Sequence, residues 1–255
     1  MRDVRIRELE KPSEFALAQM VARAAWKLED LETSSVADLI AITHAGGLTA
    51  GAFAGRELLG FVHGFPREIA GRRAQHSHLL AVEPRAQGRG LATLLKLYQR
   101  EWCLRRRIDL VTWTYDPLLV KNARLNLVRL RARARSYWRD FYGPIGGIYA
   151  DLPTDRFEVF WELSDPDVRR IARGGIPSEP SLAGAVAFRA GARHRERRVR
   201  VEIPTGAPAL YRREPKTARR ARLALRRSAE SLMGQGFEAT GLALEGERAF
   251  YLFER

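Results

Sequence analysis

The chain contains 255 residues, 45% of them apolar, and its formal net charge at pH 7 is +14. This length corresponds to one large or two small domains, and the apolar content excludes a chain that is disordered throughout. A single cysteine, Cys103, excludes a disulfide framework and a cysteine-rich zinc site. No stretch has the apolar character of a signal core or a membrane span, so we expect a cytoplasmic protein without a bound metal.

The positive charge comes almost entirely from arginine. Only five of the 44 basic residues are lysines, a skew that we attribute mainly to genome composition. Two arginine clusters, at 193–200 and 219–227, could form a nucleic-acid surface. The second cluster falls in a predicted helix over 215–233, where most of its arginines lie off the apolar stripe. The sequence therefore favours a solvated basic face, with nucleic-acid binding as the alternative.

Before residue 83 the sequence predicts four strands and two helices. Ser13 can cap one helix, and Ser34 or Ser35 can cap another that ends near two glycines at 46 and 47. Gly55 lies in a short turn between two apolar runs and predicts a hairpin. The expected elements are a strand over 4–9, helices over 13–27 and 35–46, and strands over 48–53, 58–65 and 76–82.

A glycine turn follows the strand over 76–82 and leads into an amphipathic helix. Gly88 and Gly90 permit tight turns, and a helix that starts at Leu91 directs its free N–H groups and the positive end of its dipole to one point. This arrangement suits an anion such as a pyrophosphate. The dinucleotide-binding fingerprint does not fit, because Thr93 stands where its third glycine belongs and no acidic residue for a ribose follows.

The helix after the turn is expected to pack on a sheet by one face. Apolar residues recur at helical spacing, and charged residues take the remaining positions. The apolar set is Leu91, Leu94, Leu95, Tyr98 and Trp102, and the charged set is Lys96, Arg100, Glu101 and 105–107. A run of β-forming residues over 108–114 predicts the next strand.

The turn resembles the coenzyme A signature of the GNAT acetyltransferase superfamily, Q/R-x-x-G-x-G/A. Gln87, Gly90 and Ala92 match it in one frame, and Arg85, Gly88 and Gly90 match it in an overlapping frame. The order of the predicted elements also resembles the GNAT fold, over residues 3 to about 163. The resemblance implies an α/β (α+β) fold with a mixed, mostly antiparallel sheet.

Several later motifs resemble a less-studied branch of predicted acetyltransferases within this superfamily. They are W-T-Y-D-P-L at 113–118, N-A-R-L-N-L at 122–127, F-Y-G at 141–143 and L-P-T-D-R-F at 152–157. In this branch a C-terminal extension follows the catalytic part. The domains implied are a GNAT acyltransferase domain over 1–163 and a smaller α+β extension over 164–255.

The resemblance implies that the turn holds an acyl-CoA, with acetyl-CoA as the first expectation and succinyl-CoA as an alternative that abundant arginine could serve. Arg85 and Arg89 would lie beside the pyrophosphate, and the backbone N–H of Leu80 would meet the thioester oxygen. Asn122 would hold the backbone at a gap between strands or contact pantetheine. The expected coenzyme-binding residues are Leu80, Val82, Arg85, Gln87, Gly88, Arg89, Gly90, Leu91, Ala92 and Asn122.

Two histidines on the strand over 76–82 are the candidates for the general base. Alternation along a strand places His76 and His78, together with Leu80 and Val82, on one face. In several GNAT enzymes the base lies six residues before the valine that precedes the turn, which corresponds to His76, while His78 belongs to a pattern of the branch. A pKa near ~6.5 suits removal of a proton from an α-amino group. Each histidine could instead be structural.

The general acid is harder to assign. Many relatives carry a tyrosine about seven residues beyond the asparagine of the second motif, and Arg129 stands at that position here. Tyr142, in the F-Y-G motif, is the favoured candidate, with Tyr115 and Tyr137 as alternatives, although tyrosines at such places commonly serve packing. Asp116 is expected to end a strand and cap the next helix.

Beyond residue 163 the sequence predicts a second α+β module, with no nucleophile triad, metal-ligand spacing or second glycine turn. Its expected elements are a helix over 165–173, a strand over 198–203, a helix over 215–233 and strands over 237–244 and 248–254. We expect this module to pack on the acyltransferase core, to complete an acceptor pocket or to form a homodimer.

These observations predict a cytoplasmic N-acyltransferase that moves an acyl group, most simply acetyl, from acyl-CoA to the amino group of a small molecule such as an amino acid. Direct attack in a ternary complex is the mechanism that the resemblance implies. The alternative is a non-catalytic GNAT-fold protein that binds nucleic acid through a basic surface.

Overall fold

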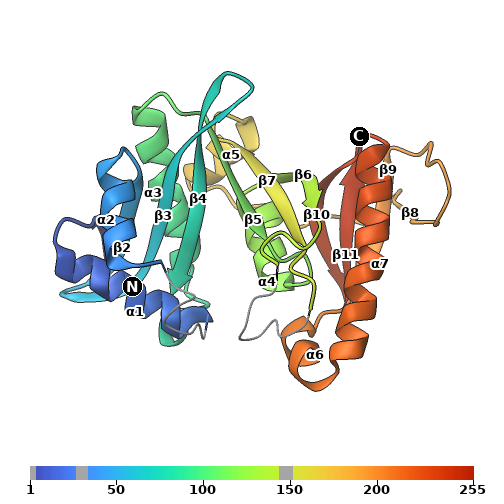
Figure 1. The fold of residues 1–255 in the computed structure, drawn as a ribbon. Coiled ribbons are helices and arrows are strands. Elements are labelled where there is room, and N and C mark those ends of the chain that lie inside the picture. Colours follow the sequence, from blue (N-terminus) through green and yellow to red (C-terminus); the bar gives the residue numbers. More distant parts are fainter. Residues whose placement is uncertain (1–3, 27–33, 144–151) are drawn as a thin grey trace. The chain divides into compact units, whose positions relative to one another are not determined.

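The computed structural model describes residues 4–26, 34–143 and 152–255 (Figure 1). The chain divides into two compact units, Met1–Trp113 and Thr114–Arg255. This division reflects packing density along the chain and does not test the domain boundary predicted between residues 163 and 164, which stays a prediction. No helix formed by the described residues has both the length and the apolar character that a membrane span requires.

Five of the strands that the structure describes form the centre of the first unit. Its strands are β1 (Val4–Glu8), β2 (Leu48–Ala54), β3 (Glu57–Ile69), β4 (Arg72–Val82) and β5 (Leu110–Tyr115), whose last two residues fall in the second unit. The strands lie in chain order, antiparallel except for β4 and β5, which run parallel. The predicted mixed, mostly antiparallel sheet is therefore confirmed.

The hairpin between β3 and β4 is longer than the sequence predicts. Pro66 lies inside β3, where a proline normally argues against a strand, and it pairs with Gln75. Ala70 and Gly71 both have positive φ angles, 49° and 77°, and make a two-residue turn between the strands. Turns with two positive φ angles match the twist of a hairpin, which explains why the strands continue up to this point.

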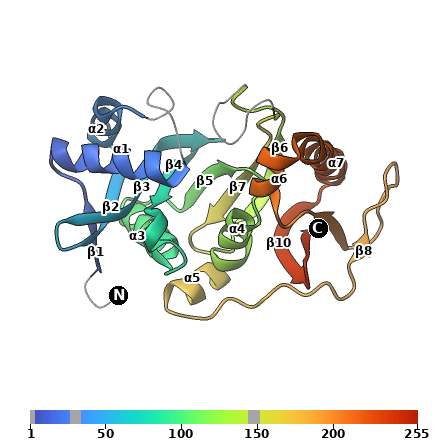
Figure 2. The same cartoon turned by 90° about the horizontal axis from the view of Figure 1, so that it is seen from below.

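Three helices cover the two faces of this sheet. Helices α1 (Pro12–Trp26) and α2 (Val36–His44) lie on one face and α3 (Leu91–Arg105) lies on the other (Figure 2). Ser35 caps α2, because its hydroxyl accepts a hydrogen bond from the Asp38 N–H at 3.0 Å, as one of the two predicted caps. The predicted end of the first helix at Lys27 lies outside the described residues. Apolar side chains of α1, α2, β2, β3 and β4 form one buried core cluster.

Helix α3 buries a broader face than the sequence predicts. Lys96 and Arg100, expected in solvent, are buried, whereas Leu94, expected in the core, is 41% exposed. Polar partners explain the difference for Lys96. Its Nζ donates to Ser77 Oγ on β4 at 3.0 Å and to Gln99 Oε1 at 2.8 Å, and it lies 3.6 Å from the centroid of the Trp113 ring.

The second unit contains six more of the described strands and the C-terminal helices. Its strands, in spatial order, are β7 (Arg156–Glu162), β6 (Arg133–Trp138), β10 (Glu238–Glu245), β11 (Arg248–Glu254), β9 (Arg198–Ile203) and β8 (Val186–Ala187). Its helices are α4 (Val120–Ala123), the π-helix η3 (Arg124–Arg129), α5 (Pro166–Ala172), α6 (Ala207–Arg213) and α7 (Pro215–Gly234). Because β6 pairs with both β7 and β10, the last strands of the chain extend the sheet to which β6 and β7 belong.

A buried ion pair joins α7 to the segment after β5. Arg222 of α7 donates to both carboxylate oxygens of Asp116, at 3.0 and 2.9 Å, and the two side chains are 0% and 1% exposed. Asp116 also accepts from the Leu118 N–H at 3.0 Å, so it shapes the turn after the strand. The prediction that Asp116 caps the next helix is wrong, because the residue before α4 is Leu119, which makes no side-chain cap.

Candidate active site

Strand β4 carries a bulge beside its histidines. His63 of β3 pairs with Leu79, and the next residue, Gly64, pairs with Ser77, so one step on β3 spans two steps on β4. The extra residue is His78. Such a bulge bends a strand locally and re-aims its side chains.

Because of the bulge, the side chains of Leu80 and Val82 lie on a different face of the sheet from the one predicted. Ser77 points toward α3, whose Lys96 it contacts, whereas Leu79 and Ala81 pack with the core under α1 and α2. Side chains alternate on each side of the bulge, so Leu80 and Val82 lie on the face opposite to Leu79. The prediction that these two share a face with His76 and His78 is therefore wrong. Alternation fails here because the bulge inserts one residue.

The two histidines themselves do lie together, as predicted. The ring centroids of His76 and His78 are 6.2 Å apart, and Phe65 of β3 stacks on His76 at 5.0 Å. His78 keeps an exposed edge, and desolvation by the surrounding protein lowers its pKa. A neutral imidazole at physiological pH is the form that can accept a proton.

A third histidine, which the sequence analysis did not single out, belongs to this cluster. His63 is fully buried on β3, and its ring centroid lies 6.4 Å from that of His78. Burial, with a smaller contribution from the charge of His78, lowers the pKa of His63 to about 4. The sequence feature that could have identified His63 is its position in a predicted strand next to the strand that carries His76 and His78.

Strands β4 and β5 separate soon after they meet. Within the described part of the first unit, their pairing is confined to Gln75 with Val111 and His76 with Thr112. From Ser77 onward this edge of β4 has no β5 partner, although β4 continues to Val82. A strand edge without a neighbour offers N–H and C=O groups to a ligand, and Leu80 lies on this edge.

The glycine turn has the geometry that its sequence predicts. After β4, the 3-10 turn η2 (Pro84–Ala86) leads to Gly88 and Gly90, whose φ angles are 78° and 82°. Both are left-handed conformations that favour glycine, and a Cβ built on either would meet nothing within 4 Å. Gly90 is the N-cap of α3 and offers no side chain to its first-turn N–H groups. The helix therefore begins with uncapped donors beside open space.

The side chains around the turn divide into anchoring and exposed groups. Gln87 donates from Nε2 to the carbonyl of Val82 at 3.0 Å, which ties the turn to the end of β4. Arg85 is ion-paired with Glu57, at the start of β3, and its predicted place beside a pyrophosphate stays a prediction. Arg89 is exposed, while Leu91 and Val82 are buried and fix the turn on the core.

The predicted acid and pantetheine candidates belong to the second unit. Tyr142 is 46% exposed, and its hydroxyl lies 3.4 Å from Thr114 Oγ1. Asn122 is exposed on α4 and Arg129 is exposed at the end of η3. Tyr115, one of the two alternative acid candidates, has a structural role. It is buried against Tyr251, with the two hydroxyls 3.3 Å apart, and burial raises the pKa of Tyr115.

Tyr137 is likewise a structural residue. Its hydroxyl donates to Asp155 Oδ2 at 2.7 Å, and burial together with that carboxylate raises its pKa. A phenol that already donates to a buried carboxylate has no free proton for a leaving group. Of the three tyrosines that the sequence offered, Tyr142 is the exposed one, at 46%.

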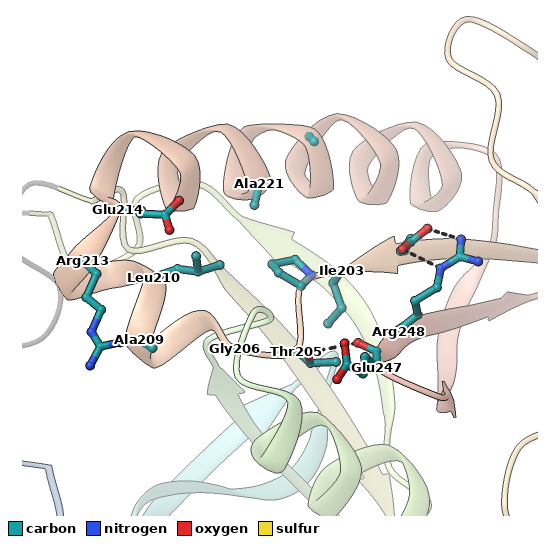
Figure 3. Close-up of a pocket in the computed structure, with 13 residues that line it drawn as sticks. Ile203, Thr205, Gly206, Ala209, Leu210, Arg213, Glu214, Ala221, Glu247 and Arg248 are labelled. Atoms are coloured by element: carbon teal, nitrogen blue, oxygen red, sulfur yellow. Dashed lines mark hydrogen bonds and ion pairs between the residues drawn. The ribbon is translucent and has the colours of Figure 1, made fainter.

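A separate pocket of about 620 Å³ lies in the second unit (Figure 3). Its walls come from α6, the start of α7 and the loops that flank β9 and β11, and Ile203 and Leu210 supply apolar surface. The guanidinium of Arg248 is engaged by Glu202 in two hydrogen bonds of 2.9 and 2.6 Å. None of the predicted site residues lines this pocket. Among the described residues, no group of three or more potential ligands is arranged to hold a metal ion.

Comparisons with known proteins identify the fold. The chain matches the crystal structure of an N-acetyltransferase from Staphylococcus aureus with a TM-score of 0.53 and 12% identity, covering 64% of this chain and 99% of that one. It matches a protein assigned to the GNAT acetyltransferase family from Desulfovibrio desulfuricans with a TM-score of 0.52 and 17% identity, covering 63% and 99%. The ribosomal-protein-S18-alanine N-acetyltransferase of Escherichia coli matches with a TM-score of 0.51 and 15% identity, covering 64% and 95%.

These likenesses confirm the GNAT fold and leave a C-terminal extension outside it. No model of a protein family matches the sequence. No curated protein matches it either. Because the identities are low, they establish the architecture, and the activity has to be argued from the residues.

Proposed function

We propose that this protein is an acyl-CoA-dependent N-acyltransferase, most simply an acetyltransferase, that acts on the amino group of a small molecule. The observation that carries the proposal is the start of α3. Two left-handed glycines face open space there, and the helix begins without a side-chain cap. Backbone donors and the helix dipole then favour a negatively charged group at this point.

The residues of the turn fit the pyrophosphate of a coenzyme A. Gly88 and Gly90 leave the space that a Cβ would narrow, Gln87 fixes the turn to Val82, and the exposed Arg89 is available to an anion. The free edge of β4 beyond His76 would take the extended pantetheine arm by backbone hydrogen bonds. When bound, acetyl-CoA would supply the acetyl group as a thioester. We propose Asn122 as a further contact for the same arm.

The chain's own groups can perform the proton and charge steps. His76 and His78 lie together on β4, and a neutral imidazole at either position can take a proton from an ammonium, directly or through one water. The Leu80 N–H, on the free edge of β4, can donate to an oxyanion. Tyr142 is our candidate for returning a proton to a leaving group. We propose direct attack by the amine in a ternary complex, the mechanism that the GNAT resemblance implies, with the turn and the strand supplying placement.

Amino acids are the acceptors that we propose first. The cytoplasm is the compartment that a buried free thiol, Cys103, suits best. The basic surface gives weaker support to the nucleic-acid alternative than its charge suggests, because several of its arginines are committed to carboxylates. In the clusters at 193–200 and 219–227 these pairs are Arg198 with Glu254, Arg222 with Asp116 and Arg226 with Asp155. The predicted homodimer stays a prediction.

A donor and acceptor screen tests the proposed function. Purified protein is mixed with acetyl-CoA or succinyl-CoA and a library of amino acids and small amines, and the products are identified by mass spectrometry. We expect acylated amine together with a stoichiometric amount of free coenzyme A. Coenzyme A release without any acylated amine, or no release with any donor, would contradict the proposal.

A further inference from the structure

His63 is the one member of the histidine cluster with no place in the reaction proposed above. It lies on β3, is 0% exposed, and presents its ring edge-on to His78 at an interplanar angle of 75°. The centroids are 6.4 Å apart, and His76 follows at 6.2 Å from His78. The His78 ring is therefore a neighbour of both the buried His63 ring and the His76 ring.

A chain of hydroxyl groups fixes the proton of His63. Thr43 Oγ1 of α2 donates to the Leu39 carbonyl at 2.7 Å, Thr43 and Thr49 Oγ1 are 2.5 Å apart, and Thr49 Oγ1 lies 2.8 Å from His63 Nδ1. A carbonyl can only accept, so the Thr43 proton is used there. Each hydroxyl has one proton, so Thr49 donates to Thr43, and Nδ1–H of His63 donates to Thr49.

Because the one ring proton of neutral His63 is on Nδ1, Nε2 carries a lone pair. This atom is buried and has no hydrogen-bond partner among the described residues. A buried acceptor without a donor is rare in folded proteins and calls for an explanation. The groups that face His63 are the Thr49 hydroxyl and the Leu48 backbone on β2, which is a hydrogen-bond acceptor for the charged ring, and the His78 ring on β4. An acceptor cannot donate to the lone pair of Nε2, and the Thr49 proton is used at Thr43, so His78 is the group among these with an N–H for Nε2.

The spacing of the two rings suits one water molecule. A direct N–H···N bond of ~3 Å would bring two imidazole centroids to roughly 5 Å. The observed 6.4 Å is longer than that, and a bent bridge through one water spans such a distance. The water would have both imidazoles as partners and a third from the amine that enters the site.

We propose that His63 is a positioning residue that accepts a hydrogen bond from His78 through one water and so sets which ring nitrogen of His78 is bare. A neutral imidazole carries one N–H. When that N–H is directed to His63, the other nitrogen presents its lone pair and can take the proton of the acceptor amine. This role rests on the proposed function, with His78 as the base, and it adds a residue of β3 to the site.

Two substitutions separate the role of Nε2 from that of Nδ1. In His63→Asn the amide nitrogen can still donate to Thr49, whereas the acceptor at Nε2 is lost. In His63→Gln the longer side chain returns an oxygen near the position of Nε2. His44→Asn is the matched control, because His44 is exposed at the end of α2.

Nitrogen-15 NMR of ring-labelled histidines gives a readout that needs no activity. We expect His63 as the Nδ1–H tautomer in the unchanged protein, and His78 as a single tautomer. In His63→Asn we expect His78 to become a mixture of tautomers with a lower pKa, because an acceptor stabilises the imidazolium more than the neutral ring. An Nε2–H tautomer of His63 in the unchanged protein would overturn the proposal without any variant.

Kinetics complete the test. We expect kcat/KM for the amine to fall roughly 10- to 100-fold in His63→Asn, with its acidic limb moved to lower pH and acyl-CoA affinity unchanged, and to recover in His63→Gln. A change below twofold, with His78 unaltered in the NMR spectrum, would refute the role of His63. If the unchanged protein transfers no acyl group and the NMR result is as expected, the proposed function fails and the hydrogen-bond arrangement stands.

Discussion

Removal of Arg222 should destabilise the second unit strongly. Its guanidinium makes two parallel hydrogen bonds to Asp116 and one of 2.7 Å to the Tyr211 hydroxyl, with no solvent access. Arg222→Met leaves the Asp116 carboxylate buried with uncompensated charge, and breaking such a pair costs about 3–5 kcal/mol. Arg156 lies 3.9 Å from Asp116 and can compensate in part, so we expect about 3 kcal/mol.

The second substitution in this pair gives the sharper test. Asp116→Asn keeps an acceptor for the Leu118 N–H but removes the charge, so adding it to Arg222→Met should restore stability rather than lower it further. Urea unfolding followed by circular dichroism measures the four proteins, with Arg219→Met as a control on the exposed face of α7. The control should stay within about 0.5 kcal/mol. A loss below about 1 kcal/mol for Arg222→Met, or additive losses in the double variant, would refute the reasoning.

Two further outcomes follow from the first unit. Burial lowers the pKa of Lys96 well below its usual value, so the unfolded chain binds the proton more tightly and stability should rise with pH up to the unfolded pKa near ~10.4. Lys96→Met should flatten that rise in urea midpoints measured from pH 7 to 10, and an unchanged slope would show that Lys96 is charged in the folded protein. Separately, we expect one of the two variants His76→Gln and His78→Gln, the one that removes the base, to lower kcat/KM by roughly 10²–10⁴ with coenzyme affinity intact. Losses below about threefold in both variants would place the base elsewhere.

Local features of the sequence predicted the elements that carry the candidate coenzyme site. The β4 strand, the turn through Gly88 and Gly90, and the start of α3 at Leu91 follow from spacing and residue type, and the structure confirms them. Each of these elements is determined by interactions among a few neighbouring residues, so the sequence pattern that predicts it is equally local.

Features that depend on a distant partner were missed. The bulge at His78 is a property of the register with β3, which no single strand encodes. Lys96 was predicted to lie in solvent because it is charged, and Arg222 was not assigned a role. Both are buried. The partner of Lys96 lies 19 residues away in the chain and that of Arg222 lies 106 residues away. Arg222 does stand on the apolar stripe of α7, four residues after Ala218 and three before Leu225. A lone arginine at such a position was the available signal for a buried carboxylate partner.

Calorimetry at the glycine turn tests the central claim most directly. Titration of the protein with acetyl-CoA, and with pantetheine as a ligand that lacks the pyrophosphate, should show tighter binding of the full coenzyme. Gly90→Glu places a carboxylate and a strained left-handed residue at the start of α3, and should abolish that advantage while leaving pantetheine binding unchanged. Gly71→Glu, in the left-handed turn between β3 and β4, carries the same charge and backbone strain and should bind acetyl-CoA normally. Equal acetyl-CoA affinity in the unchanged protein and in Gly90→Glu would contradict the account.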